Sequence, residues 1–295
     1  MLTLEQLSAL LEAHRPAAAA QVAEFELGGR PFAFNSQPAI MGVVNLSADS
    51  WYRESVFLTT DAAVARAKVL AAQGAALVDV GAESTLAHAA RVDEAAQNSR
   101  LLPVIRELRA ADILVSVETY QPAVTRACLE AGANVLNLTG TDCSEELFRL
   151  VAAHDAAVII CYVQGRNVRE VGDFDFAADP IAPLQDYFAR QIETAQRCGV
   201  NKIFIDPGLG FYYRNLQDSA VRVRHQMKVF LNTFRLRSLG VPICQALPHA
   251  FEFFGEEVRC AEPFFAVLAA LGKTDLFRTH EVPRIKAVLD TLKVF

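Results

Sequence analysis

Polar and charged side chains stand at the ends of the apolar segments of this sequence. Burying a carboxylate is costly unless it is paired, so a buried strand has no structural need for one at its end. A polar group at every such position therefore favours a rim that binds a ligand over a set of isolated structural hydrogen bonds. The residues are Asn45, Glu83, Glu118, Asn137, Gln164, Asp206, Gln245, and Arg278 with His280.

The residue types narrow the chemistry of that ligand. Glu118, Asn137 and Asp206 supply hydrogen-bond acceptors, and a carboxylate can accept two parallel N–H bonds from an amidine-like edge. Arg278 and His280 are two positions apart, which places them on one face of an extended segment, where Arg278 can hold an oxyanion. The alternative for Arg278 is an ion pair with Glu118 or Asp206. Together these residues predict a flat, N–H-rich heterocycle at one end of the site and an anionic group at the other.

Eight short apolar runs, separated by helical patterns, would position these residues. Short runs that are nearly all apolar and rich in β-branched residues are typical of parallel strands buried on both faces. Eight strand–helix units predict an α/β fold, the (β/α)8 TIM barrel, with its active site on the face where the strands end. The connections after strands are the long, polar ones, at 45–60, 82–91, 164–179 and 207–216. The runs themselves lie at 39–44, 76–81, 113–117, 134–138, 157–163, 202–206, 241–247 and 275–279.

Residues 1–38 precede the first strand–helix unit. Leucines at helical spacing near the start of the chain predict a short amphipathic helix. Residues 25–34, around Gly28 and Gly29, predict a hairpin. We expect residues 1–38 to form an extension that caps the barrel, and residues 39–295 to form the barrel domain.

The composition excludes several classes of protein. The chain has 295 residues, of which 52% are hydrophobic and 21% charged, and a disordered chain would be less apolar. With a net charge of −6 it lacks the basic character of a nucleic-acid-binding protein, and no uninterrupted apolar stretch is long enough to span a membrane. The six cysteines occur singly, and neither they nor the histidines have the spacing of a zinc site. The N-terminal segment lacks the basic start of a secretion signal, so the expected compartment is the cytoplasm.

Six motifs at the predicted strand ends resemble those of the dihydropteroate synthases. They occur in the family's order and cover roughly residues 39–285, essentially the whole predicted barrel. MGVVNLSADSW at 41–51 resembles the family's MGILNVTPDSF, VDVGAEST at 78–85 its I-D-x-G-x-E-S-T, and SVETYQPAV at 116–124 its S-V-D-T-Y-K-x-x-V. NLTG at 137–140, IDPGLGF at 205–211 and RTHEV at 278–282 are similar to its N-D, D-P-G-x-G-F and R-V-H-D-V.

The resemblance implies a pterin-binding barrel that joins 6-hydroxymethyl-dihydropterin pyrophosphate to p-aminobenzoate, releasing pyrophosphate in folate biosynthesis. It implies a homodimer, Mg²⁺ bound with the pyrophosphate, and no organic cofactor. Asn45 is then the expected metal ligand. The implied roles are the pterin's N–H edge for Asp206, further pterin contacts for Asn137 and Glu118, and pyrophosphate for Asn45, Arg278 and His280.

The sequence departs from the family where the second substrate is bound. The family's seventh strand ends in S-R-K, but this chain has Pro248-His249-Ala250 and no lysine there. The second loop keeps Ser84 and Thr85 but has Leu86-Ala87 in place of the family's R-P. Ser84, Thr85 and His249 are therefore the candidates for contacts with a second substrate or with the loops.

Three functions remain open. The chain is a divergent synthase, a pterin-dependent transferase acting on another amine or on a methyl group, or a pterin-binding or partner subunit without synthase activity. The retained pyrophosphate residues favour the first, and the missing S-R-K favours the other two. His249 can partly replace a lost cation. Arg53, Arg91 and Arg166 can reach the site from loops, although the favoured alternative for each is an ordinary solvated surface arginine. Residues 165–180 are expected to form a lid or contact segment, or part of a second-substrate pocket.

Overall fold

The computed structural model describes residues 2–47, 49, 55–85, 89–211, 213–216 and 218–294. Eight parallel strands form one sheet in the order β8-β7-β6-β5-β4-β3-β10-β9. A parallel bridge between Ile205 and Ile243 joins the two edge strands and nearly closes the barrel. The predicted TIM barrel is therefore confirmed, as are all eight strands. Their bounds are β3 Ala39–Asn45, β4 Leu77–Gly81, β5 Leu114–Thr119, β6 Val135–Leu138, β7 Ala157–Cys161, β8 Ile203–Asp206, β9 Cys244–Ala246 and β10 Leu276–Thr279.

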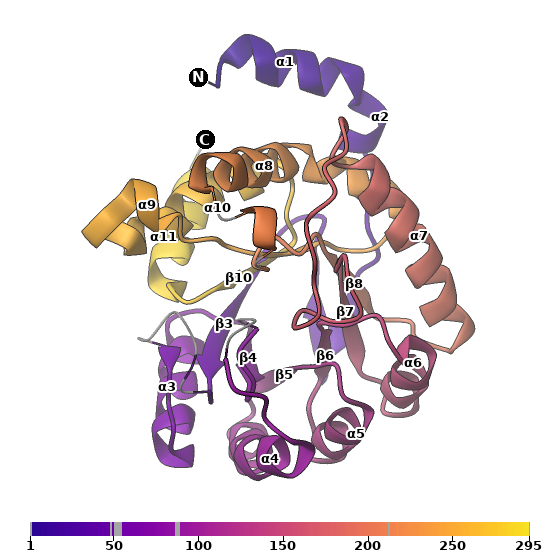
Figure 1. Cartoon of the computed structure of the whole chain (residues 1–295), viewed down its shortest axis with the longest axis vertical. Coiled ribbons are helices and arrows are strands. Elements are labelled where there is room, and N and C mark those ends of the chain that lie inside the picture. Colours follow the sequence, from indigo (N-terminus) through magenta and orange to yellow (C-terminus); the bar gives the residue numbers. More distant parts are fainter. Residues whose placement is uncertain are drawn as a thin grey trace.

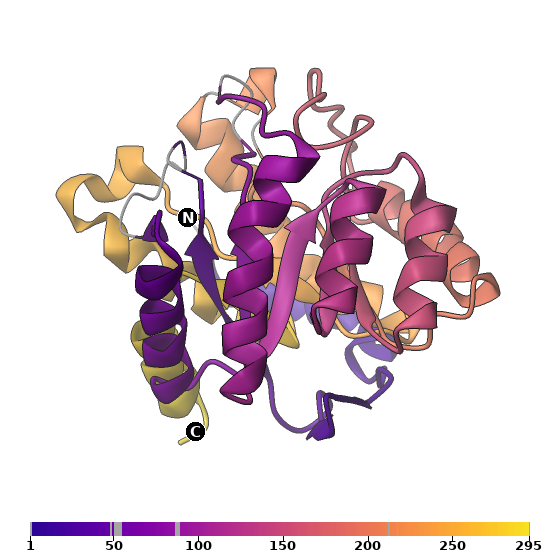
Figure 2. The same ribbon diagram turned by 90° about the horizontal axis from the view of Figure 1, so that it is seen from below.

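Helices follow the strands and surround the barrel (Figure 1). Seen from below, α3, α4, α5 and α6 lie side by side along one flank (Figure 2). None of the helices in the described part of the chain is long and apolar enough to cross a membrane. The α-helices after the strands are α3 Thr60–Ala72, α4 Glu94–Ala110, α5 Pro122–Glu130, α6 Ser144–Ala153, α7 Ala182–Arg197, α8 Ser219–Asn232, α9 Phe251–Phe254, α10 Ala261–Leu271 and α11 Val282–Leu292, with 3-10 segments η2 Arg214–Leu216, η3 Thr233–Leu239 and η4 Gly255–Cys260.

Two hydrophobic cores explain why both faces of the strands are apolar. One core lies between the strands and the surrounding helices, and the other fills the barrel interior. Strand side chains alternate between the two faces, so neighbouring residues such as Val78 and Leu77 belong to different cores. The interior core includes the first residue of six strands, namely Leu77, Leu114, Val135, Ala157, Cys244 and Leu276.

The N-terminal residues contribute to the interior core. Strands β1 (Phe25–Leu27) and β2 (Arg30–Phe32) form the predicted antiparallel hairpin. The Phe34 ring that follows it lies 5.3 Å from the Phe204 ring of β8, edge to face. The hairpin thus packs at the end of the barrel where the strands begin, which leaves the opposite end open for a site.

Helices α1 (Leu4–Ala13) and α2 (Arg15–Ala18) lie outside this interior. In Figure 1, α1 lies at the edge of the molecule above α8, and its Leu7 and Leu10 pack, partly buried, against the outer core. None of the residues of α1 or α2 is fully buried, and Leu4 is 81% exposed. The predicted N-terminal helix is present, but it makes a smaller contribution to the core than the hairpin does.

Candidate active site

A pocket opens where the barrel strands end, on the side opposite to the hairpin. Its lining includes residues from the ends of β3, β4, β5, β6, β8, β9 and β10. The structure therefore brings together side chains that are far apart in the sequence. The residues predicted to act in catalysis, pterin binding or second-substrate contacts all line this pocket: Asn45, Ser84, Thr85, Glu118, Asn137, Asp206, His249, Arg278 and His280.

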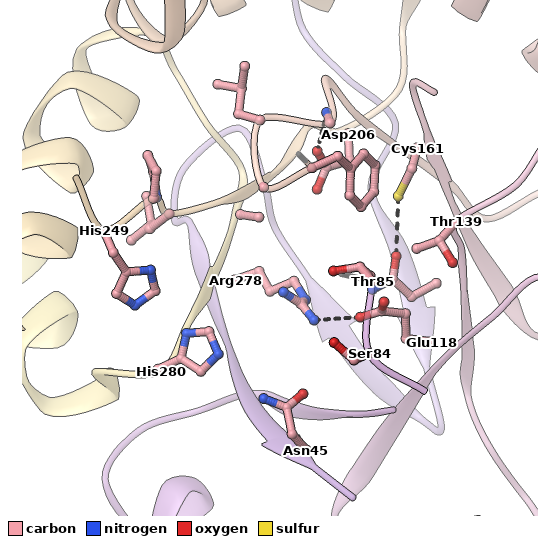
Figure 3. Close-up of a pocket in the computed structure, with 18 of the residues that line it drawn as sticks. Asn45, Ser84, Thr85, Glu118, Thr139, Cys161, Asp206, His249, Arg278 and His280 are labelled. Carbon is pink, nitrogen blue, oxygen red and sulfur yellow. Dashed lines mark hydrogen bonds and ion pairs between the residues drawn. The ribbon is translucent and has the colours of Figure 1, made fainter. Parts of the chain in front are cut away.

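Arg278 is the charged centre of the pocket. Its Nε lies 2.8 Å from Asp79 Oδ2, and its Nη2 lies 2.7 Å from Glu118 Oε2. In Figure 3, His249, His280 and Asn45 lie to one side of Arg278 and Asp206 and Cys161 to the other. The ion pair with Glu118 is the alternative that the sequence left open, and the second partner is Asp79 rather than Asp206.

Asp79 is a buried carboxylate that contacts several residues of the pocket, and it was not singled out from the sequence. It is 1% exposed, and its carboxylate accepts hydrogen bonds from Ser116 Oγ over 2.6 Å and from Asn137 Nδ2 over 3.0 Å. Because Asn137 donates its amide hydrogen to Asp79, its Oδ1 is oriented to accept the thiol of Cys161 at 3.4 Å. The carboxylate thereby fixes both the guanidinium of Arg278 and the carboxamide of Asn137.

Two carboxylates of the pocket have raised pKa values. Burial raises the pKa of Glu118 to about 7, against the opposing effect of the Arg278 charge. Burial also raises the pKa of Asp206 to about 6, although the Gly208 N–H, 2.7 Å from Asp206 Oδ1, and Arg278 lower it. A buried carboxylate is stabilised by a ligand that brings further N–H groups to it. Such a ligand is the one predicted for this end of the site.

Two residues expected on the rim lie elsewhere. Gln245 is fully buried, and its Nε2 donates over 2.6 Å to Thr233 Oγ1 of η3, on the helix side of the barrel. Gln164 Nε2 donates over 3.0 Å to the hydroxyl of Tyr162. The prediction for these two residues was wrong, because alternate strand residues face the helices and the loop after β7 turns back on itself.

The loop side of the pocket is held by backbone contacts. Ser84 Oγ donates to the carbonyl of Asp49 over 3.2 Å, and the Ser84 carbonyl accepts Arg169 Nη1 over 2.7 Å. Arg169 is 8% exposed and also donates to the carbonyl of Ala89. Residues 165–180 thus contribute a structural tie between the loops after β7 and β4.

Two of the arginines considered as replacement cations, Arg91 and Arg166, are not among the residues that line the pocket. Arg91 pairs with Glu170 at 3.2 Å and Arg166 with Asp142 at 2.7 Å, and both arginine side chains are more than half exposed. Arg53 lies outside the described residues, as does Leu86-Ala87.

Arg222 of α8, which sequence reasoning missed, lines the pocket instead and pairs with Glu252 at 2.7 Å. Its helix follows the loop after β8 by several residues, so no strand-end pattern marks it.

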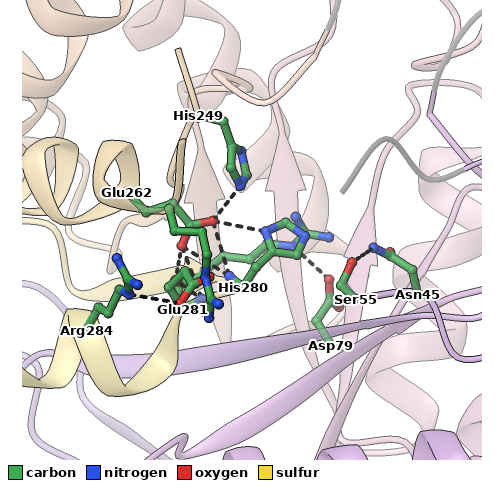
Figure 4. A network of polar contacts seen from close by, with 11 residues as sticks. Asn45, Ser55, Asp79, His249, Glu262, His280, Glu281 and Arg284 are labelled. Carbon is green, nitrogen blue, oxygen red and sulfur yellow. Dashed lines mark hydrogen bonds and ion pairs between the residues drawn. The ribbon is translucent and has the colours of Figure 1, made fainter. Parts of the chain in front are cut away.

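Beside the pocket, three residues from different elements converge. His249 Nε2 and His280 Nδ1 each lie 3.0 Å from Glu262 Oε1 (Figure 4). Glu262 lies on α10 and is fully buried. The sequence spacing did not indicate this cluster, since each member follows a different strand or lies on a helix.

Comparison with known proteins places the chain among pterin enzymes. The family of pterin binding enzymes matches residues 41–245. The dihydropteroate synthase of Streptococcus pyogenes serotype M6 is 31% identical over 276 residues, covering 88% of this chain and 98% of that protein. The dihydropteroate synthase of Synechocystis sp. is 27% identical over 268 residues, covering 87% and 89%.

Solved structures agree with the sequence relatives. The dihydropteroate synthase of Xanthomonas albilineans with 4-aminobenzoic acid matches with a TM-score of 0.78 at 28% identity, over 93% of this chain and 98% of that one. The complex of the same enzyme with 7,8-dihydropteroate matches with a TM-score of 0.75 at 26% identity, over 92% and 98%. The chain belongs to the dihydropteroate synthase family of pterin-binding enzymes, which are transferases.

Proposed function

We propose that this chain condenses 6-hydroxymethyl-dihydropterin pyrophosphate with p-aminobenzoate or a related amine in folate biosynthesis. The observation that carries the proposal is the pocket itself. It places buried carboxylate acceptors beside Arg278 and His280 in a barrel whose relatives are dihydropteroate synthases. An N–H-rich ring and a phosphate group are the two halves of the proposed substrate.

Each half of the pocket has a distinct role in this proposal. Asp206, held by the Gly208 N–H, accepts the N–H edge of the pterin, with Asn137 and Glu118 as further contacts. Arg278 and His280 bind the pyrophosphate and stabilise the charge that develops on it as the bond to carbon breaks. Loss of pyrophosphate in an SN1-like step leaves the pterin methylene carbon open to attack by the amine.

Mg²⁺ is the metal that the family resemblance implies, and the side-chain oxygen of Asn45 is suited to coordinate it. Asn45 Nδ2 lies 2.5 Å from Ser55 Oγ, which turns the carboxamide oxygen away from that serine. Mg²⁺ typically takes few protein ligands and completes its octahedron with waters and substrate phosphates. When bound, the ion would offset the charge of the departing pyrophosphate. Asn45→Ala should then weaken pyrophosphate binding in the presence of Mg²⁺ but not in its absence, as measured by calorimetry.

Arg222 supports the synthase over a binding protein without activity. The chain lacks the S-R-K lysine, yet the Arg222 guanidinium lines the pocket beside Gln226 and Phe251. A guanidinium there suits the carboxylate of an aminobenzoate, which would share or replace its ion pair with Glu252. The missing lysine favours the alternatives, a pterin-dependent transfer to another acceptor or a subunit that only binds pterin.

Product analysis and calorimetry separate these functions. Purified protein with the pterin pyrophosphate and p-aminobenzoate should release pyrophosphate and form dihydropteroate, detected by mass spectrometry, and the gene should complement a strain without the synthase. Product only with other amines would indicate a related transfer. Pterin binding without any product would indicate a pterin-binding protein that has lost synthase activity. Absence of pterin binding would contradict the proposed pocket.

The second-substrate side of the pocket is tested by a separate titration. The sequence departures predict that p-aminobenzoate and sulfonamides bind more weakly than the pterin does. Arg222→Met should weaken p-aminobenzoate binding further and leave pterin binding unchanged, since the residue is not among the proposed pterin contacts. Sulfonamide affinity equal to that of S-R-K synthases would contradict the altered subsite.

We also propose a homodimer formed through α10. Phe264, Val267 and Leu271 lie on one face of this helix and are 41%, 36% and 54% exposed. Apolar groups at this helical spacing on an outward face fit a second copy of the same helix. Sedimentation should find a dimer that the double variant Phe264→Ser/Leu271→Ser converts to monomer, whereas Val69→Ser on α3, which is 45% exposed, should leave it intact. A monomeric parent protein would contradict the proposal.

We place the protein in the cytoplasm. All six cysteines are free thiols, and three of them are buried, which suits a reducing compartment. Labelling of thiols trapped in intact cells should find six reduced cysteines per chain. A disulfide in that material would contradict the assignment.

A further inference from the structure

We propose that His249, Glu262 and His280 form a binding site for one divalent transition-metal ion, with Zn²⁺ as the best-fitting case. Two imidazoles and a carboxylate are a ligand set that such ions favour. The site is separate from Asn45 and does not depend on synthase activity.

The geometry of the three side chains supports a common ion. The candidate ligand atoms of all three residues lie within 4.8 Å of one another, and Glu262 Oε1 lies 3.0 Å from a ring nitrogen of each histidine. Atoms about 2.1 Å from one tetrahedral ion lie about 3.4 Å apart. The two contacts with Glu262 are about 0.4 Å shorter than this spacing, so an ion would push the carboxylate oxygen and each ring nitrogen slightly apart. The two ring nitrogens, within 4.8 Å of each other, would move toward the ion through small rotations of the imidazoles.

The protein positions the carboxylate before any ion binds. Glu262 accepts the Thr279 hydroxyl and the backbone N–H groups of His280, at 3.2 Å, and Glu281, at 3.3 Å. Contacts of this kind, outside the coordination set, orient ligands and are a recurring part of metal centres. Glu262 is fully buried and His249 is 2% exposed, so both side chains are held by packing as well as by hydrogen bonds.

A cation bound next to Glu262 would stabilise the charge of its buried carboxylate. Its ion partners among the described residues are the two histidines. The arginines nearby are engaged elsewhere: Arg259 and Arg284 with Glu281, and Arg278 with the pocket carboxylates.

The histidines are suited to act as ligands. His249 Nε2 and His280 Nδ1 each face the same carboxylate oxygen, Glu262 Oε1, at 3.0 Å. A divalent ion held by the carboxylate and the two imidazoles would offset the charge of the buried carboxylate. Because His249 and His280 also line the pocket, the ion would sit in the pocket wall, where a phosphate or carboxylate oxygen is the class of group that completes its coordination.

Metal titration of the full chain tests the site directly. Protein stripped with a chelator should bind about one Zn²⁺ per chain by calorimetry, and Co²⁺ in its place should give the intense visible absorption of a tetrahedral site. Glu262→Gln and His249→Ala should each weaken binding by more than about 100-fold, beyond the 10- to 100-fold cost of changing supporting contacts. His154→Ala, at an exposed helix end, should bind like the parent.

Circular dichroism and thermal melting identify variants that fail to fold, and His280→Ala provides a third removal of a ligand. Absence of stoichiometric binding by the parent would overturn the proposal. So would parental affinity in folded Glu262→Gln and His249→Ala. Pterin titration of the metal-free protein keeps this outcome distinct from the test of the synthase, because pterin binding does not require the ion.

Discussion

At the scale of single residues, the raised pKa values of Asp206 and Glu118 link ligand binding to pH. A charged acceptor forms the stronger hydrogen bonds to a pterin N–H edge. Burial raises the pKa of Asp206 to about 6, so its carboxylate becomes charged as the pH rises through that value. Binding of the pterin should therefore strengthen between about pH 5 and pH 7.5, as measured by calorimetry.

The variant Asp206→Asn separates this effect from that of Glu118. We expect a loss of pterin affinity of about 10- to 100-fold at pH 7.5, from the loss of charge-assisted hydrogen bonds, and a flatter pH profile. Asp186→Asn on the exposed face of α7 is the matched control. Unchanged affinity in Asp206→Asn would mean that the pterin binds elsewhere.

Stability of the ligand-free protein should change with pH in the opposite direction. A carboxylate with a raised folded-state pKa contributes stability that is full below its unfolded pKa of about 4 and lost as the pH rises through the folded value. For Asp206 and Glu118 the loss falls between about pH 4 and about pH 7. The difference in melting temperature between pH 5 and pH 8 should shrink in Asp206→Asn, and an unchanged difference would contradict this linkage.

At the scale of elements, the turn after β8 depends on a close approach of two backbones. Gly208 has φ of +76°, and a Cβ there would lie 2.2 Å from the carbonyl oxygen of Tyr162. The Gly208 N–H also binds Asp206 Oδ1. The turn therefore holds both the end of β8 and the carboxylate proposed to bind pterin.

Gly208→Ala and Gly240→Ala form a matched pair that isolates this contact. Gly240 has φ of +78°, but a Cβ there would meet nothing within 4 Å. Strain in the left-handed region costs about 1 kcal/mol in both variants. Gly208→Ala should lose at least about 2 kcal/mol more in denaturant unfolding, from overpacking, and should also lose pterin affinity. Equal losses in the two variants would contradict the role of the close approach.

At the scale of the whole molecule, the N-terminal extension divides into two parts. Phe34 is 4% exposed and packs against Phe25 and Phe204 at the closed end of the barrel. Arg237, 4% exposed, pairs with Asp275 and donates to Asn35 over 2.8 Å. Helices α1 and α2 lie outside these contacts.

Truncation and substitution should separate the two parts. Removing residues 2–17 should cost no more than about 2 kcal/mol of unfolding free energy and leave pterin binding intact, since no residue of α1 or α2 is fully buried. Phe34→Ala should cost about 3–5 kcal/mol. Denaturant melts measure both, and a truncated chain that cannot fold would show that α1 and α2 belong to the barrel domain.

The sequence by itself determined the barrel and the rim. Strands buried on both faces must be apolar throughout, and eight such runs alternating with helices leave little choice of fold. Parallel strands all end on one face of the barrel. Polar residues at strand ends, such as Asn137 and Asp206, must therefore lie close together in one pocket. The positions of the strands and of the polar residues at their ends follow from local sequence patterns, so they can be predicted from the sequence alone.

Only the tertiary structure decided how those residues are paired and held. Asp79 sits within an apolar strand, and its role follows from β5, β6 and β10 placing Ser116, Asn137 and Arg278 around it. Glu262 lies on a helix whose pattern is otherwise that of a packing element. Contacts between residues distant in sequence have no local periodicity. The charge balance of the pocket, and the cluster of His249, Glu262 and His280 beside it, therefore emerge only when the barrel closes.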